Sequence, residues 1–333
     1  MSSKRILVTG AGGFIGLELC KHLAAAGHQV TGVDVRYPTG GSASAFERHT
    51  MDYRDIGATE SLMRGQHVVF HLASAHLDVE LSDEVYWDVN VRGLSDLMSL
   101  AVAEGVERYV HVSSVSVYGN LDSWPANEDS PCHPQSIYGE TKLAGEAEVR
   151  AFCDRTGLPA VILRPTWVYG ATCPRTQKLY RALRRGTFPM IGGGANVRHP
   201  IYITDLLQAL DLAMGQPVAG NETYIIGGDQ VVTTADFIDT MCKVFGLRKP
   251  WIRVPHFAGQ VAARVIESGS AMIGIDPPVS RRTLEFFNTN NGFDISKARS
   301  ELGFAPSYTL EEGLSDCRAA IIAMKNHNQE NEK

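Results

Sequence analysis

Short runs of aliphatic and β-branched residues alternate with helical patterns along the first half of the chain. A first strand is expected at residues 5–9, followed by a helix that ends at Gly27, because glycine readily takes the left-handed conformation that terminates helices. Further strands are expected at residues 30–34, 67–73, 108–114 and 160–164. Each run is apolar enough for a strand that is buried on both faces. The alternation predicts an α/β fold, with a doubly wound parallel sheet and helices on both of its faces.

The alternation weakens after about residue 170. Helices are expected at residues 177–185 and 204–214, with a glycine-rich turn between them at Gly192–Gly194. This change of pattern divides the chain into three expected parts: an N-terminal α/β domain over residues 1–170, a smaller lobe over residues 171–325 that is interleaved with late elements of the first domain, and a polar, frayed tail over residues 326–333.

Two helix starts in the second half have a recognisable sequence. Thr309 is followed three residues later by Glu312, and Thr233 is followed in the same way by Asp236. This spacing is typical of a capping box, in which the two side chains satisfy backbone amides at the start of a helix.

The composition is that of a globular enzyme. The 333 residues, 44% of them hydrophobic, suffice for one large domain or for a domain with a smaller partner. Acidic residues outnumber basic ones by 37 to 31, and no basic cluster is interleaved with aromatic residues, so a nucleic-acid partner is not expected. No apolar run approaches the roughly 20 residues that span a bilayer, and the first residues lead directly into a strand. We therefore expect a cytoplasmic protein without a membrane partner.

The six cysteines are scattered along the chain and form no CxxC pair. Such spacing is typical of reduced, mostly buried thiols rather than of disulfides or of a metal site. We expect no bound metal.

Three glycines, Gly10, Gly13 and Gly16, follow the first expected strand and open the helix after it. In this setting Gly10 makes the tight turn, Gly13 lets the backbone approach a pyrophosphate, and Gly16 packs the helix against the strand. The N-terminus of the helix then faces the anion. The arrangement predicts a dinucleotide site, which makes residues 1–170 a Rossmann-type NAD(P)-binding domain and residues 171–325 a substrate-binding lobe.

Asp34 ends the second expected strand. An acidic side chain at this place accepts hydrogen bonds from the ribose hydroxyls of NAD and repels the 2′-phosphate of NADP. This favours NAD. Arg36 lies close enough to neutralise such a phosphate, so NADP stays open as the less favoured cofactor.

Tyr138 and Lys142 are four residues apart, so on a helix both side chains project from one face. An ammonium beside a phenol stabilises the phenolate and lowers a pKa that starts at about 10 toward the value that a general base needs. Tyr138 would then take the proton from a substrate hydroxyl while hydride leaves the same carbon. The strand expected at residues 108–114 ends in Ser113 and Ser114, at the sheet edge where open α/β sheets bind their ligands.

These segments resemble the extended short-chain dehydrogenase/reductases, in particular the NAD-dependent epimerase/dehydratase family. The likeness covers TGAGGFIG, MDYRD, HLAS, NVRG, VSSVSVYG, YGETK and RPTWVYG in the first 170 residues, and continues less closely in VRHPIYITDL and SKARSELGFAP. The resemblance implies that Ser114 hydrogen-bonds the reacting oxygen, that Tyr138 is the acid and base, and that Lys142 serves both Tyr138 and the nicotinamide ribose.

The resemblance also implies further residues of the cofactor site. Asp52 and Tyr53 would lie against the adenine, Leu72 and Ala73 would pass beneath the cofactor, and Asn90 would sit behind the active site. Phe14, Ile15 and Pro165 complete the expected set. His71 is interpreted as a hydrogen-bonded structural histidine, and Ser113 as a support rather than a nucleophile, since no Ser-His-Asp arrangement surrounds it.

Departures from the family's patterns bear on the substrate. Sugar-nucleotide 4,6-dehydratases carry an Asp-Glu pair where this chain has Val115 and Ser116, so dehydration is not expected. Trp167 stands where UDP-galactose 4-epimerase-like enzymes usually offer an asparagine, and is either a core residue or a substrate contact. Arg198 falls where those epimerases keep an arginine for the substrate diphosphate, although a structural ion pair is the alternative. Ser116, with Ser114, is a further expected substrate contact.

The stretch of residues 255–292 lacks the Arg-x-Gly-Asp element of the epimerases. It resembles the apolar lobe of 3β-hydroxysteroid dehydrogenase-like and dihydroflavonol reductase-like members. We therefore hypothesise NAD-dependent hydride transfer at a secondary alcohol or ketone carbon, with nucleotide-sugar 4-epimerisation first and oxidation or reduction of an apolar substrate as the alternative. A non-catalytic dinucleotide sensor is a third hypothesis, which the presence of Tyr138, Lys142 and Ser114 disfavours. The family also leads us to expect a homodimer, formed through the helices that include residues 94–103 and 138–155.

Overall fold

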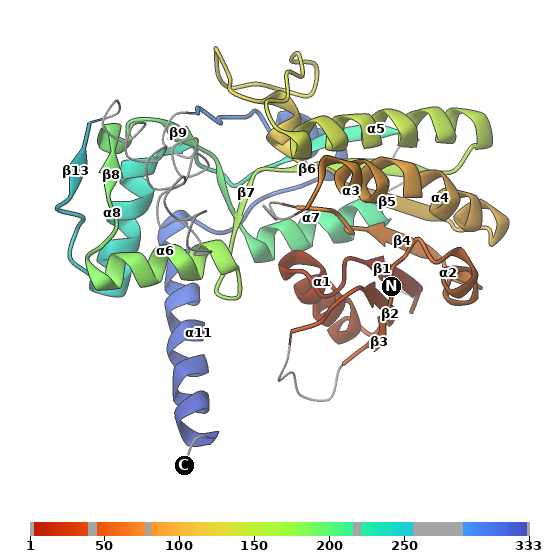
Figure 1. The fold of residues 1–333 in the computed structure, drawn as a ribbon, viewed down its shortest axis with the longest axis horizontal. Helices are drawn as coiled ribbons and strands as arrows, with labels where there is room; N and C mark the ends of the chain where they lie inside the picture. The colour runs from red at the N-terminus through yellow and green to blue at the C-terminus, as the bar shows by residue number, and fades with distance from the viewer. Residues whose placement is uncertain (1–2, 39–44, 77–80, 216–220, 256–288, 332–333) are drawn as a thin grey trace.

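The computed structural model describes residues 3–38, 45–76, 81–215, 221–255 and 289–331. Its centre is a seven-stranded sheet with the order β11-β6-β5-β4-β1-β2-β3, in which all neighbouring strands are parallel. Helices lie on both faces of this sheet (Figure 1). The predicted α/β class and doubly wound parallel sheet are therefore confirmed.

The strands of this sheet are β1 (Arg5–Thr9), β2 (Gln29–Asp34), β3 (Glu47–Thr50), β4 (Val68–His71), β5 (Arg108–Val112), β6 (Ala160–Pro165) and β11 (Glu222–Ile226). All five strands expected from the sequence are present. β4 and β5 end two residues earlier than expected, at His71 and Val112, because the chain leaves the ladder there and turns into the site. β11 was not expected, and it adds the outermost strand beside β6.

The helices around the sheet are α1 (Phe14–Ala25), α2 (Ile56–Met63), α3 (Asp83–Trp87), the π-helix η1 (Asp88–Arg92), α4 (Gly93–Ala103), the 3₁₀-helix η2 (Val115–Tyr118), α5 (Ile137–Thr156), α7 (Ile203–Gly215) and the π-helix η4 (Ala298–Leu302). α1 ends just before Gly27, which has a φ of 89°, as the sequence predicted.

Two cores lie on opposite faces of the sheet, because successive side chains of a strand point to opposite sides. Ile6 and Val8 face the core that Leu19 of α1 and Leu206 of α7 complete. Leu7 faces the other core, which is completed by α4 and α5. The runs that are apolar at every position are thus explained by burial on both faces.

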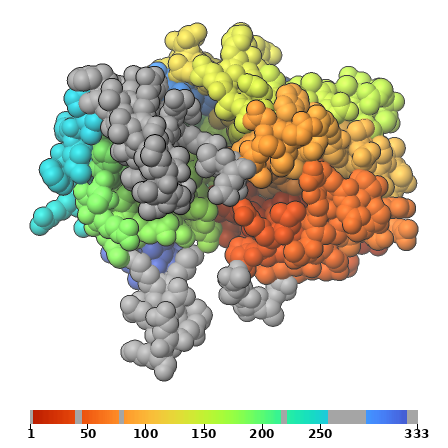
Figure 2. Space-filling view, viewed as in Figure 1, coloured from red at the N-terminus to blue at the C-terminus, as the bar shows by residue number. Residues whose placement is uncertain are grey.

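The lobe consists of β7 (Trp167–Tyr169), α6 (Pro174–Arg185), β8 (Met190–Ile191), the 3₁₀ turn η3 (Gly192–Gly194), β9 (Val197–Arg198), β10 (Pro200–Tyr202), β12 (Val232–Thr233), α8 (Thr234–Phe245), β13 (Arg253–Val254) and α11 (Leu310–Asn331). Its core includes Tyr169, Phe237 and Leu314. Figure 1 shows this lobe on the side of the molecule opposite β2 and β3, and Figure 2 shows its green surface beside the red and orange surface of the first elements.

Both capping boxes are confirmed. The Thr233 hydroxyl accepts from the Asp236 amide at 3.0 Å, and the Glu312 carboxylate accepts from the Thr309 amide at 2.9 Å. The helix expected at residues 204–214 is α7, whereas the one expected at residues 177–185 starts earlier, at Pro174, where proline is favoured in the first turn. The tail expected to fray from residue 326 is helical as far as residue 331.

Candidate active site

The glycine loop between β1 and α1 has no room for side chains. Gly10 has a φ of 74°, and a Cβ on it would lie 2.6 Å from the Ala73 nitrogen at the end of β4. A Cβ on Gly16 would lie 2.1 Å from the Gly10 oxygen. Gly13 is the N-cap of α1 and has no side chain to accept a hydrogen bond. The cap therefore offers no side-chain acceptor to the first amides of the helix, at Phe14 and Ile15. This bare, close-packed turn fits a pyrophosphate.

Asp34 is fixed beside that loop at the end of β2. Its carboxylate accepts from the Gly12 amide at 2.9 Å and from the Arg36 amide at 3.1 Å. A side chain at position 12 would not fit here, because a Cβ on Gly12 would lie 1.9 Å from the Arg36 oxygen and 3.0 Å from the Asp34 Cγ. The carboxylate is therefore held where the ribose of a dinucleotide on the glycine loop would lie.

Asp52 and Tyr53 follow β3, at the same sheet edge. Asp52 forms an ion pair with Arg54 at 2.6 Å, and these hydrogen bonds hold the pKa of the Asp52 carboxyl below its ordinary value. Tyr53 is 4% exposed, and its hydroxyl donates to the Val89 carbonyl at 2.6 Å. The Tyr53 ring belongs to the core, which leaves its backbone to face an adenine; contact of either residue with adenine stays a prediction.

The segment after β4 is tied to α5 by one buried amide. Asn90, in η1, accepts from the Ala75 amide at 2.9 Å and donates to the Ala75 carbonyl at 3.2 Å. It also donates to the Thr141 hydroxyl on α5 at 2.9 Å. Leu72 and Ala73 lie in this segment, directly beside Gly10. Asn90 therefore joins the floor of the predicted cofactor site to the helix that carries Tyr138 and Lys142.

Tyr138 lies in the first turn of α5, whose N-cap, Ser136, accepts from the Gly139 amide at 3.2 Å. Burial raises the pKa of the Tyr138 hydroxyl, and the nearby side chain of Ser114 opposes this rise. Ser114 follows β5 and caps η2, where its oxygen accepts from the Ser116 amide at 3.1 Å. The fold thus brings together the two residues that the sequence predicted for the reacting oxygen.

Lys142 lies one turn further along α5 and is 3% exposed. Its Nζ donates to the Val112 carbonyl at 2.8 Å, and burial lowers the pKa of Lys142 to about 8. Burial raises the pKa of Tyr138 to about 12, and the side chain of Ser114 and the charge of Arg175 oppose this rise. In this structure the Lys142 ammonium donates to the strand, and the expected lowering of the Tyr138 pKa by Lys142 stays a prediction.

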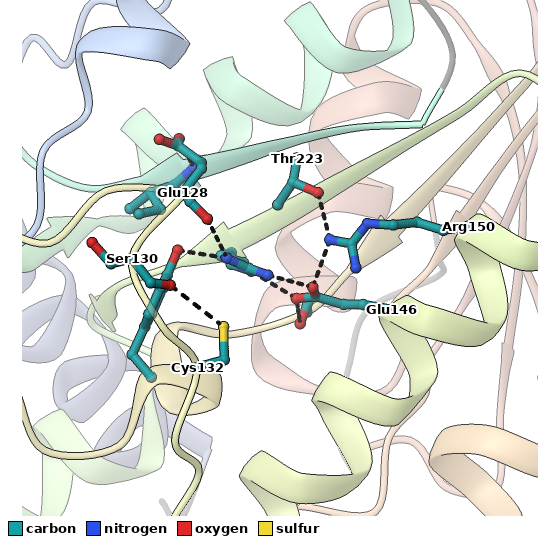
Figure 3. A network of polar contacts seen from close by, with 10 residues as sticks. Glu128, Ser130, Cys132, Glu146, Arg150 and Thr223 are labelled. Carbon is teal, nitrogen blue, oxygen red and sulfur yellow. Dashed lines mark hydrogen bonds and ion pairs between the residues drawn. The ribbon is translucent and has the colours of Figure 1, made fainter.

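A buried ionic network lies behind these residues and was not predicted. Glu146, one turn after Lys142, is fully buried and accepts from Arg164 at 2.6 Å and from Arg150 at 2.9 Å. Burial opposes ionisation of Glu146, but these arginines and the Ser113 hydroxyl at 2.6 Å hold its pKa below the ordinary value. Figure 3 shows the cluster between α5, the sheet and the segment that carries Glu128 to Cys132. The interpretation of Ser113 as a support is confirmed.

Two histidines stack in the core at paired positions of β4 and β5. His71 and His111 are each 1% exposed, with ring centroids 5.6 Å apart. His71 shares a hydrogen bond of 2.8 Å with the Thr9 hydroxyl, which confirms its interpretation as a hydrogen-bonded structural histidine. Burial, the neighbouring ring and Lys142 keep the pKa of His71 well below its ordinary value.

The predicted substrate residues lie on three different elements, Ser116 on η2, Trp167 on β7 and Arg198 on β9. Ser116 has a buried hydroxyl without a hydrogen-bond partner among the described residues. Trp167 follows Pro165 and packs on Phe237 of the lobe core, with ring centroids 4.3 Å apart. Arg198 is 5% exposed, donates to the Thr289 hydroxyl at 3.2 Å, and has a pKa lowered by burial to about 10. The contact of each with substrate stays a prediction.

Two further features concern ligands and membranes. Within the described ranges, no group of histidine, cysteine, aspartate and glutamate side chains is arranged to hold a metal ion. In the same ranges, no helix is long and apolar enough to cross a bilayer.

The apolar stretch expected at residues 255–292 lies for the most part outside the residues that the structure describes.

Fold and site together define a class: a Rossmann-type dinucleotide-binding enzyme with a tyrosine–lysine helix at the carboxyl edge of the sheet, the arrangement of the extended short-chain dehydrogenase/reductases. The model of the family described as "NAD dependent epimerase/dehydratase family" matches residues 6–227. The chain belongs to this family, as the sequence motifs indicated. It is therefore an enzyme, and NAD is its cofactor.

Similar proteins include epimerases and a reductase. UDP-glucose 4-epimerase of Mycolicibacterium smegmatis is 30% identical, over 93% of this chain and 96% of the relative. The 2-alkyl-3-oxoalkanoate reductase of Shewanella oneidensis is 26% identical, over 94% of this chain and 85% of the relative. The solved structure of MoeE5 in complex with UDP-glucuronic acid and NAD is similar over 96% of this chain and 99% of that one, with 28% identity and a TM-score of 0.76.

Proposed function

We propose that this protein is an NAD-dependent 4-epimerase of a nucleotide sugar. The observation that carries the proposal is the placement of Ser114, just after the end of β5, with Tyr138 and Lys142 on α5, where Lys142 donates to the Val112 carbonyl of β5, in a chain of this family. The likeness to an epimerase and to a structure that holds a UDP-sugar with NAD supports the choice of substrate class.

In this mechanism Tyr138 removes the proton from the sugar hydroxyl while Ser114 holds the same oxygen by a hydrogen bond. NAD, when bound, supplies the carbon that accepts hydride from the sugar and returns it. The keto sugar would turn over in the site, so that hydride returns to the opposite face of the same carbon, and Tyr138 would give the proton back to the oxygen on that carbon. Because the proton and the hydride are both returned, the enzyme ends each cycle unchanged. Lys142 would hold the ribose of the nicotinamide half.

The lobe would bind the nucleotide. Arg198 is a buried guanidinium, and its fork of donors suits a diphosphate, whose charge would offset the cost of its burial. The buried hydroxyl of Ser116, two residues after Ser114, and the indole of Trp167, which packs on Phe237, are further proposed substrate contacts. We accordingly propose residues 171–325 as the substrate lobe, with β11 returning to the sheet of the cofactor domain.

One observation favours a second candidate, oxidation or reduction of an apolar alcohol or ketone. Trp167 packs on Phe237 and extends an aromatic cluster of the lobe, where an asparagine would offer a polar contact to a sugar nucleotide. The likeness to an oxoalkanoate reductase also supports it. In that case the cofactor would leave in changed form.

We further propose a cytoplasmic homodimer. All six cysteines are free, which supports a reducing compartment. The dimer would form through α4 and α5, which lie side by side on one flank of the molecule (Figure 1). A molar mass of one chain, measured by light scattering on a size-exclusion column, would reject the dimer.

Binding experiments separate the two candidate substrates. Native mass spectrometry of the purified protein should show retained NAD, and calorimetry should show binding of UDP that Arg198→Met weakens about 10- to 100-fold, since hydrogen bonds to a charged group are lost. Arg253→Met, at an exposed position of the lobe, is the matched control and should bind UDP normally. Failure of UDP to bind, together with binding of long-chain alcohols, would reject the epimerase in favour of the apolar oxidoreductase.

A further inference from the structure

A pair of side chains outside the expected set lies next to Tyr138: His76 contacts its ring, and Arg175 contacts His76. His76, in the segment after β4, meets Tyr138 edge to face, with ring centroids 4.5 Å apart and planes at 63°. Arg175, in the first turn of α6, lies 2.7 Å from the Nε2 of His76 through its Nη2. The pair therefore links the lobe to the proposed base on α5.

The chemistry of this contact fixes the state of the imidazole. A guanidinium has only donors, so Arg175 donates and the Nε2 of His76 accepts. His76 is then neutral and carries its proton on Nδ1. A protonated imidazole would lose this hydrogen bond and would repel the guanidinium.

Both members of the pair are held in place by their own elements. Asn90 binds the backbone of Ala75, the residue before His76, on both its amide and its carbonyl. On the lobe side, the Thr172 hydroxyl donates to Glu18 of α1 at 3.2 Å, and this fixes the chain just before Arg175. The start of α6 is thus joined to the Rossmann domain at two points, Glu18 of α1 and His76 after β4.

We propose that Arg175, oriented by His76, is a positioning residue that holds a positive charge beside the phenol of Tyr138 and stabilises the phenolate. The inference rests on the proposed function, in which Tyr138 is the base. The charge of Arg175 lowers the pKa of Tyr138, against the larger effect of burial, while Lys142 donates to the Val112 carbonyl. The lobe therefore supplies a cation to the base, and ionisation of Tyr138 depends on the lobe lying against the sheet domain.

The test uses the full-length, NAD-loaded protein and two readouts. The first is phenolate absorbance as a function of pH, with the curve of Tyr138→Phe subtracted, over the range in which circular dichroism shows the fold intact. The second is the pH profile of kcat with UDP-glucose. Arg175→Gln should move the ionisation of Tyr138 and the acid limb of kcat to higher pH by about one pH unit, since Arg175 is exposed and its charge is screened.

Matched variants decide what the shift means. Arg184→Gln removes the same charge from an exposed position of the same helix and should leave both curves in place. Arg175→Lys keeps the cation, so both of its curves should lie close to those of the unaltered protein. His76→Ala should shift both curves part of the way, and His76→Gln, which still offers an acceptor to Arg175, should shift them less.

Two results would overturn the proposal. One is an Arg175→Gln protein whose absorbance titration matches that of Arg184→Gln. The other is a higher KM for UDP-glucose with both pH curves unchanged, which would make Arg175 a substrate ligand. Because the absorbance titration needs no substrate, a shifted titration without turnover of UDP-sugars would support the role of Arg175 and reject only the proposed substrate.

Discussion

The neighbours of the Tyr138 phenol come from separate elements of the chain. Ser114 follows β5, His76 follows β4, and Arg175 lies in the first turn of α6. Burial raises the pKa of this phenol, so each hydrogen bond and each charge that favours the phenolate matters to its use as a base. The reactivity proposed for one side chain is therefore a property of its contacts across the fold.

The first prediction concerns Glu146, which joins Ser113, Arg150 and Arg164. Glu146→Gln removes the charge that balances the buried Arg164. We expect the free energy of unfolding to fall by about 3 kcal/mol, measured by urea denaturation. Glu148→Gln, a partly exposed position on the same helix, should change it by no more than about 0.5 kcal/mol. Equal losses in the two variants would show that the network does not stabilise the fold.

Residues of the site differ in how far the sequence could predict them. Tyr138 and Lys142 are separated by one helical turn, so local spacing was enough to find them. The partner of Lys142, the Val112 carbonyl, lies on a strand 30 positions away and depends on how α5 packs on the sheet. His76 and Arg175 meet across 99 positions, and no local pattern marks either of them. The sequence shows Glu146 one helical turn after Lys142, but its partners Ser113 and Arg164 come from distant parts of the chain and could not be predicted from that spacing.

At the scale of elements, the turns before and after α1 each contain a glycine with a positive φ, and the two glycines have different surroundings. Gly10 and Gly27 have φ values of 74° and 89°, but only at Gly10 would a Cβ meet other atoms, the backbone of Leu72 and Ala73. Gly27→Ala should cost about 1 kcal/mol of unfolding free energy and leave NAD in place.

Gly10→Ala should pay the same strain and also push the end of β4 away from the loop. We expect native mass spectrometry to show that this variant has lost its NAD. A Gly10→Ala protein that retains NAD as well as Gly27→Ala does would contradict the proposed position of the cofactor.

The elements that the sequence predicted well are those with local signals, such as a glycine loop or a capping box. β11 lacked such a signal: it is a short apolar run far beyond the alternating region, and its place comes from pairing with β6, Glu222 against Val161. The start of α6 at Pro174 and the short ends of β4 and β5 were missed for a related reason, since packing decides where an element ends.

At the scale of the whole molecule, three buried histidines make stability depend on pH. Burial lowers the pKa of His71, His111 and His199 below the ordinary value of about 6.5. Well above that pH these rings are neutral in both the folded and the unfolded state, so their contribution to the free energy of unfolding does not change with pH. As the pH falls below it, the unfolded state binds protons that the folded state does not, and stability is lost.

We expect each histidine to lower the free energy of unfolding by up to about 1.4 kcal/mol in total between about pH 7.5 and about pH 5.5, because the unfolded ring takes up its proton around a pKa of about 6.5. Urea denaturation at about pH 7.5 and about pH 5.5 measures the change. His111→Phe removes one of the three rings, so the loss of unfolding free energy between the two pH values should be smaller by the contribution of one histidine. A stability that does not change over this range would mean that these rings are protonated in the folded protein.

The most direct test of the proposed enzyme follows UDP-glucose and UDP-galactose in the purified, NAD-loaded protein while the absorbance of NADH is recorded. We expect the two sugars to interconvert without net formation of NADH, and Tyr138→Phe to slow the reaction at least about 100-fold with NAD still bound. Formation of NADH in proportion to the sugar consumed, or an unchanged rate in Tyr138→Phe, would contradict an epimerase that uses this phenol as its base.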